Sequence, residues 1–100
     1  MGATVTIIKP TTAAVSDKQP LDARAHDRVV ISAAGLATTE TAQVFLGGGA
    51  DWAVLSLDGT NPVKLTATRQ SIELPGGLYG IVKDATAAAV GINATLLGEG

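Results

Sequence analysis

The chain has 100 residues, a formal net charge of −2 and no cysteine, which is enough for one domain and excludes disulfides and thiolate metal sites. Its seven basic residues are scattered, so we expect no cationic surface that would bind nucleic acid. No apolar run approaches the roughly 18 residues that cross a bilayer, and the first residues lack a secretory signal pattern, so no membrane partner is expected.

The apolar residues are mostly small or β-branched. Hydrophobic residues make up 46% of the chain, but 17 of them are Ala and only three are aromatic, whereas Thr, Val and Ile number 12, 9 and 6. β-branched side chains are stiff at χ1 and fit a pleated sheet. The composition therefore predicts a mostly β protein, whose thin aliphatic core lies between two sheets or is completed by another subunit.

Residues 1–27 predict an N-terminal strand followed by an arm. Residues 3–8 alternate between apolar and polar side chains, as a half-buried strand does, and Pro10 is expected to end that strand. The polar, Ala-rich segment 11–27 predicts a short strand near 13–16 and a loop or helical turn at 21–25. Because a structureless connection of this length is unusual, the segment is either a functional arm or partly ordered.

Residues 28–100 predict the body of the fold. Asp58-Gly59 between two alternating runs is a strong hairpin signal, Gly47–Gly49 predicts a flexible turn, and 52–83 is expected to form a meander of four strands. The strands predicted in the body are 28–34, 41–46, 52–57, 63–68, 72–74, 78–83 and 90–97. About eight short strands are typical of an antiparallel β-sandwich of the immunoglobulin type, or of a small barrel.

The residues that could carry chemistry have simpler explanations. His26 lies between Asp22 and Asp27, but a zinc site needs three or four converging ligands, so we expect solvated loop side chains. The glycines at 47–49 lack the following Lys-Ser/Thr of a phosphate loop, and the serines show no nucleophile-elbow pattern. The sequence thus predicts no catalytic residue, no metal ligand, no cofactor and no enzymatic activity.

Trp52 and Tyr79 are the most informative large residues. Buried Trp and Tyr usually find a hydrogen-bond partner, and both are enriched at interfaces, so core packing and an exposed binding platform are alternatives. Tyr79 opens a late strand after the turn at 75–77, which is the place of a tyrosine corner in immunoglobulin-like sandwiches. We expect both side chains to pack in the core.

From Arg28 to Leu97 the order of features resembles small structural proteins of tailed bacteriophages, namely head-decoration and fibre-like proteins. The resemblance rests on the runs VVISAA, SLDGTNPVKLTA and LPGGLYGIVKDATAAAVGI, and bacterial surface immunoglobulin-like modules share much of it. It implies a non-enzymatic virion protein, made in the host cytoplasm, that binds and stabilises the outside of a capsid as a decoration or cement protein. Its partner would be the major capsid protein, and it would form a homo-oligomer such as a trimer. Residues 2–27 would form the arm that reaches the shell.

The alternative is a carbohydrate- or surface-binding module of a phage tail, a fibre or a bacterial surface protein. Such a module would recognise carbohydrate through Trp52 and Tyr79. Exposed aromatic side chains near hairpin tips would favour this function, and a buried Trp would count against it.

Overall fold

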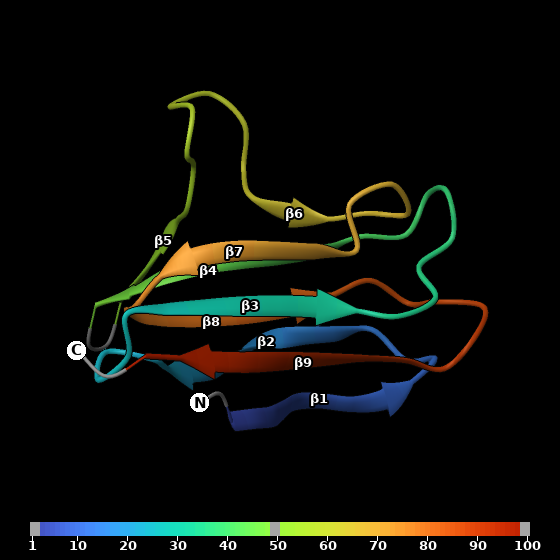
Figure 1. Ribbon diagram of the computed structural model, residues 1–100. Helices are drawn as coiled ribbons and strands as arrows, with labels where there is room; N and C mark the ends of the chain where they lie inside the picture. Colours follow the sequence, from blue (N-terminus) through green and yellow to red (C-terminus); the bar gives the residue numbers. More distant parts are fainter. Residues whose placement is uncertain (1–2, 49–50, 99–100) are drawn as a thin grey trace.

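Two antiparallel sheets packed face to face form the protein, as a computed structural model describes it for residues 3–48 and 51–98 (Figure 1). Sheet A has the strand order β1-β9-β3-β7, and sheet B has the order β2-β8-β4-β5, with β6 also paired to β4. The strands are β1 (Ala3–Thr11), β2 (Val15–Asp22), β3 (Arg28–Ala33), β4 (Ala42–Gly48), β5 (Asp51–Val54), β6 (Lys64–Leu65), β7 (Ser71–Pro75), β8 (Leu78–Lys83) and β9 (Val90–Leu97). The predicted all-β sandwich is confirmed. Within the described ranges no helix is long and apolar enough to cross a membrane.

The core between the sheets is aliphatic, as the composition predicts. Because successive side chains of a strand point to opposite faces, each strand contributes alternate residues, such as Val29 and Ile31 of β3 and Ile92 of β9, all fully buried. Burying one such side chain contributes about 1.5–3 kcal/mol. Tyr79 is the one aromatic residue of this core within the described residues.

The predicted meander over 52–83 is wrong. β5 and β6 do not pair with each other, because both pair with β4, one after the other along the same edge. β7 then crosses to sheet A and β8 returns to sheet B. The hairpin expected at Asp58-Gly59 is instead a loop that projects from the sandwich (Figure 1) and is closed by one backbone bond, from Val63 N to Leu55 O at 2.8 Å. Pro62 in this loop has no N–H for a ladder.

The N-terminal segment is ordered over residues 3–22, which is one of the two alternatives left open, and it forms edge strands of the two sheets that are longer than the expected 3–8 and 13–16. β1 pairs with β9 and runs through Pro10, and β2 pairs with β8 and runs through Pro20. Proline is tolerated there because an edge strand leaves one row of N–H groups unpaired. Register shifts interrupt both pairings, which conceals the strands from a reading of simple alternation.

Candidate interaction surface

The outer face of sheet A is polar. Its outward side chains alternate with the buried ones, and they include the hydroxyls of Thr4 and Thr95, which lie 3.5 Å apart across the β1–β9 pair. Arg28 and Glu73 form an exposed ion pair at 3.9 Å across β3 and β7. This face has the composition of a sheet surface in contact with water.

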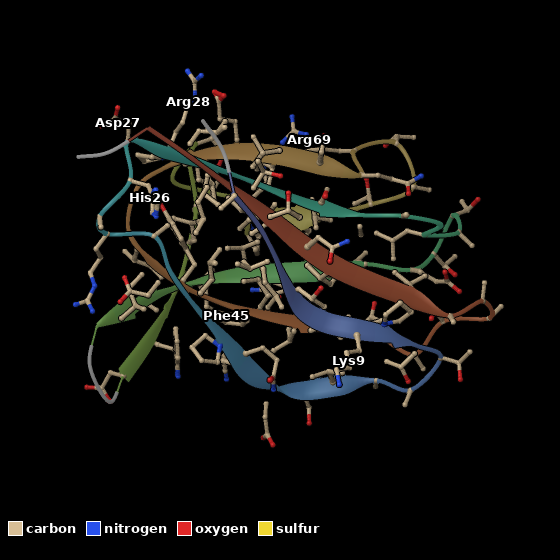
Figure 2. The ribbon with its side chains drawn as sticks, turned by 60° about the horizontal axis from the view of Figure 1, so that its bottom comes forward. Lys9, His26, Asp27, Arg28, Phe45 and Arg69 are labelled. Atoms are coloured by element: carbon tan, nitrogen blue, oxygen red, sulfur yellow. The ribbon has the colours of Figure 1, made fainter. Side chains whose placement is uncertain are left out.

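The outer face of sheet B has an apolar centre, bordered by Asp22 on β2, Gln43 on β4 and Lys64 on β6, which the register places in the same phase. Along β4, Val44 points into the core, so Phe45 points outward, and the register places Val54 beside it on β5. Trp52 pairs with Gly47, two residues further along β4, so it points to the same outer side as Phe45 and Val54. We call the following set the apolar face: Phe45, Gly47, Trp52, Val54, Leu78, Gly80 and Val82. Figure 2 shows Phe45 on the side of β4 that points away from sheet A, and Val54 is 58% exposed.

Two glycines form the floor on which Trp52 lies. A Cβ atom added at Gly80 would lie 2.6 Å from Cζ3 of Trp52, and one added at Gly47 would lie 2.8 Å from the same atom. The indole ring therefore crosses from β5 over β4 to β8, and it fits only because both positions lack side chains. Trp52 is half-buried on the outside of the sandwich, so its predicted place in the core is wrong.

A lysine extends the apolar face onto β2. The Nζ atom of Lys18 lies 4.9 Å from the centroid of the Phe45 ring, which is the geometry of a cation–π interaction. The Lys18 stem passes beside Gly80, where an added Cβ would lie 3.0 Å from Lys18 Cβ. The methylene groups of the lysine thus widen the apolar area while the ammonium stays in water.

Tyr79 takes the structural role predicted for it. Its side chain is 3% exposed, and its hydroxyl donates a hydrogen bond to the carbonyl oxygen of Pro75 at 2.5 Å. Burial raises the pKa of the phenol. The bond ties the start of β8 to the end of β7 in the other sheet, as a tyrosine corner does, so Tyr79 offers no exposed platform to a ligand.

The residues considered for a metal site do not converge. His26 Nδ1 lies 2.9 Å from the carbonyl oxygen of Gly98, whereas Asp22 binds Arg24 at 2.8 Å. The hydrogen bonds from Arg24 lower the pKa of Asp22 to about 2. No group of three His, Cys, Asp or Glu side chains that could hold a metal ion occurs in the described part of the chain.

The two remaining candidates are the turn at Asp58 and the glycines at 47–49. Asp58 accepts hydrogen bonds from the backbone N–H groups of Thr60 and Asn61, at 2.8 Å each, and these hold the pKa of its carboxyl far below the usual value. The residue thus turns the chain, as expected. Of the glycines expected as a flexible turn, Gly47 and Gly48 lie in β4, and the third lies outside the described residues.

A buried lysine is the feature that the sequence analysis missed. Lys83 is 3% exposed, and its ammonium donates to the carbonyl oxygens of Thr11, Ala13 and Asp84 at 2.9–3.0 Å and approaches the Thr86 hydroxyl at 3.3 Å. It joins the β1–β2 and β8–β9 connections. The alternation of β8 could have predicted this burial, because Lys83 has the same phase as Tyr79 and Ile81, whose side chains point into the core. All its partners are neutral, so its role is structural.

Comparisons of the chain with protein-family models, with curated proteins and with solved structures found no match. Function is therefore inferred from the residues and from the contrast between the two sheet faces.

Proposed function

We propose that the protein is a non-enzymatic structural protein that docks through the apolar face of sheet B onto the outside of a phage capsid. The observation that supports it is the apolar centre of the outer face of sheet B, which the polar outer face of sheet A lacks. An antiparallel sheet with one solvated face normally carries polar side chains there. Contiguous apolar side chains on the surface mark interaction sites; here Val54 is exposed and the neighbouring Phe45 and Trp52 are half-buried.

The size of the face favours a partner larger than a second copy. Its three strands of about five residues span roughly 14 Å by 17 Å, or about 240 Å², whereas a stable pair of proteins buries about 800 Å² on each partner. Two copies docked by this face alone would fall short. The surface of a capsid protein is larger, so it can also contact the rim at Lys18 and Asp22 and bring neighbouring copies together.

The energetics favour attachment through more than the apolar face. Burial of about 240 Å² contributes about 6 kcal/mol at 25 cal/mol per Å², which is at the low end of the cost of association, about 4–15 kcal/mol. The apolar face alone therefore gives weak binding. Attachment becomes strong when the shell adds contacts at the rim and between adjacent copies, so the proposal places the homo-oligomer on the shell, in the virion.

The N-terminal segment has a different part in this proposal from the one the sequence suggested. β1 and β2 complete the edges of the two sheets, and β2 supplies Lys18 to the rim of the apolar face. Docking is therefore assigned to the face of sheet B rather than to an arm at residues 2–27.

The experiment is co-sedimentation with shells assembled from the major capsid protein of the same source, using the wild type, Phe45→Glu and Thr95→Glu. Phe45→Glu places a carboxylate in the centre of the apolar face, beside Lys18, which can pair with it and preserve the fold. Thr95→Glu makes the matched change on the polar face of sheet A. We expect wild type and Thr95→Glu to sediment with the shells and Phe45→Glu to remain in solution.

Two results would contradict the proposal. In the first, Phe45→Glu, shown by circular dichroism to be folded, binds the shells as well as the wild type. In the second, the source of the chain encodes no capsid protein.

The carbohydrate-binding alternative keeps one of its two predicted residues. Tyr79 is buried and its hydroxyl is engaged by Pro75, so only Trp52 is left to stack on a sugar ring, and its ring already lies against Gly47 and Gly80. The observations therefore favour docking on a protein surface.

A further inference from the structure

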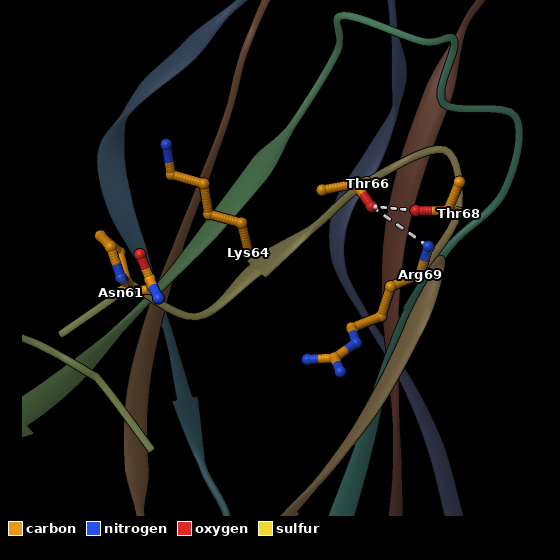
Figure 3. A pocket seen from close by; sticks show the side chains of 6 residues that line it. Asn61, Lys64, Thr66, Thr68 and Arg69 are labelled. Carbon is orange, nitrogen blue, oxygen red and sulfur yellow. Dashed lines mark hydrogen bonds between the residues drawn. The ribbon is translucent and has the colours of Figure 1, made fainter. Parts of the chain in front are cut away.

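An open groove lies where the β5–β6 loop meets the turn between β6 and β7 (Figure 3). Its volume is about 420 Å³, and it is lined by Asn61, Pro62, Lys64, Thr66, Thr68 and Arg69. A second hollow of about 330 Å³ shares Asn61, Pro62 and Arg69 with it and is also lined by Leu57, Asp58 and Val63. The two hollows meet at Arg69, and we call them together the loop groove.

Hydrogen bonds hold both walls of the loop groove in place. On one wall, Asp58 accepts bonds from the backbone N–H and the side-chain amide of Asn61, at 2.8 and 3.1 Å. On the other, Thr66 N donates to Arg69 O at 2.8 Å, and Arg69 N is 3.1 Å from Thr66 Oγ1. The Thr66 and Thr68 hydroxyls lie 3.3 Å apart. Binding would therefore cost little ordering of the backbone.

The charges in the loop groove are mostly free for a ligand. Among the described residues, the ion pairs are Arg24 with Asp22 and Arg28 with Glu73, so Lys64 and Arg69 have no carboxylate within 4.0 Å. Asp58 also lines the groove, but its carboxylate accepts the hydrogen bonds of its own turn. Figure 3 shows the Arg69 guanidinium directed away from its turn, toward the side on which Asn61 lies. The groove thus offers two unpaired cations in a chain with a net charge of −2.

The polar groups between the cations define the rest of the ligand. Two hydroxyls and one amide, from Thr66, Thr68 and Asn61, can exchange hydrogen bonds with a hydroxylated molecule. The ring of Pro62 and the side chain of Leu57 can cover its CH surface. A guanidinium matches a carboxylate in a bidentate fork. Two cations are too few for the several phosphate contacts that nucleic acid binding requires.

We propose that the loop groove binds an acidic saccharide, with the carboxylate on Arg69 and the sugar hydroxyls on Asn61, Thr66 and Thr68. The loop groove adjoins the apolar face, because Lys64 pairs with Gln43 and Gln43 pairs with Val82 of that face. Trp52 pairs with Gly47, four residues and about 13 Å further along β4. The saccharide site is therefore tested on the free protein, without a shell, so that its failure and the failure of docking are distinguishable.

The experiment is a calorimetric and NMR titration of the full chain with three probes: a short oligogalacturonate, a neutral oligogalactose of the same length, and inorganic phosphate. We expect the oligogalacturonate to bind, to shift the amide signals of Thr66 and Arg69, and to weaken as salt is raised. Arg69→Gln should reduce its affinity about tenfold, since a charge-assisted fork is lost. Arg24→Gln, which alters an exposed arginine at the end of β2, should leave the affinity unchanged.

Three outcomes would overturn the proposal. Equal binding of the neutral oligomer would show that the cations do not select the ligand. Phosphate binding as tightly as the oligogalacturonate would mean a general anion site and no saccharide recognition. Unchanged affinity in Arg69→Gln would place the binding elsewhere; this variant should fold normally, because the Arg69 side chain is exposed and the turn uses only its backbone.

Discussion

The buried Lys83 gives the sharpest prediction on stability, in the substitution Lys83→Met. Methionine keeps the length and the apolar stem but removes the ammonium and its hydrogen bonds. Thr11 O loses its closer donor, because the single proton of the Thr86 hydroxyl lies 2.6 Å from Ala88 O and 3.2 Å from Thr11 O. Ala13 and Asp84 are exposed, so water can reach their carbonyls. Bonds from a charged group contribute about 1.5–3 kcal/mol each, and part of this is offset because the ammonium no longer has to be desolvated.

We therefore expect Lys83→Met to lower the free energy of unfolding by about 2–3 kcal/mol. In a domain of this size that corresponds to a fall in Tm of roughly 10–20 °C. The measurement is urea denaturation followed by circular dichroism, with Lys9→Met on the exposed part of β1 as the control that removes a solvated charge. A loss of unfolding free energy below about 0.5 kcal/mol, against the expected loss of about 2–3 kcal/mol, would refute the assigned role of the ammonium.

Three further predictions concern the face, the corner and the acid range. Gly80→Ala puts a Cβ atom where it would meet Trp52, so we expect red-shifted fluorescence and easier quenching by acrylamide; an unchanged spectrum would contradict the glycine floor. Tyr79→Phe should cost about 1–2 kcal/mol in urea denaturation, because the bond to Pro75 is lost, and no cost would mean that this bond contributes nothing. Glu40 accepts bonds from the N–H groups of Ala37 and Ala87, which lower its pKa. Its stabilisation is therefore present above the unfolded pKa of 4.5 and is lost as the pH falls through the lower folded value. The Tm difference between wild type and Glu40→Gln should shrink in acid, and a constant difference would argue against it.

Strands with strong alternation could be predicted from the sequence because burial imposes it directly. β8 and β9 begin and end where the pattern predicts, at Leu78–Lys83 and Val90–Leu97. The period of two says which residues of a strand share a face. It does not say which strand lies beside it, since pairing depends on contacts between distant segments. This is why β5 and β6 were expected to form a hairpin although both pair with β4.

The candidate surface was harder to predict for a related reason. Trp52 shares a phase with Val54, but alternation alone leaves open whether that phase points into the core or to the outside. The scarcity of aromatic residues favoured the core, and the two glycines that admit the indole ring lie far apart in sequence, at Gly47 and Gly80. Only their pairing through β4 and β8 brings them under Trp52. Tyr79 was predicted correctly because its hydrogen bond is local, reaching back four residues to Pro75.

The central claim is that the apolar face of sheet B is the docking surface, and footprinting tests it most directly. The protein is labelled with a photoactivated carbene, alone and bound to shells of the major capsid protein, and the labelled side chains are located by mass spectrometry. We predict that Phe45, Trp52 and Val54 lose label on the shells, whereas Asn93 and Thr95 on sheet A keep theirs. Protection of the sheet A residues with continued labelling of the apolar face would contradict the claim.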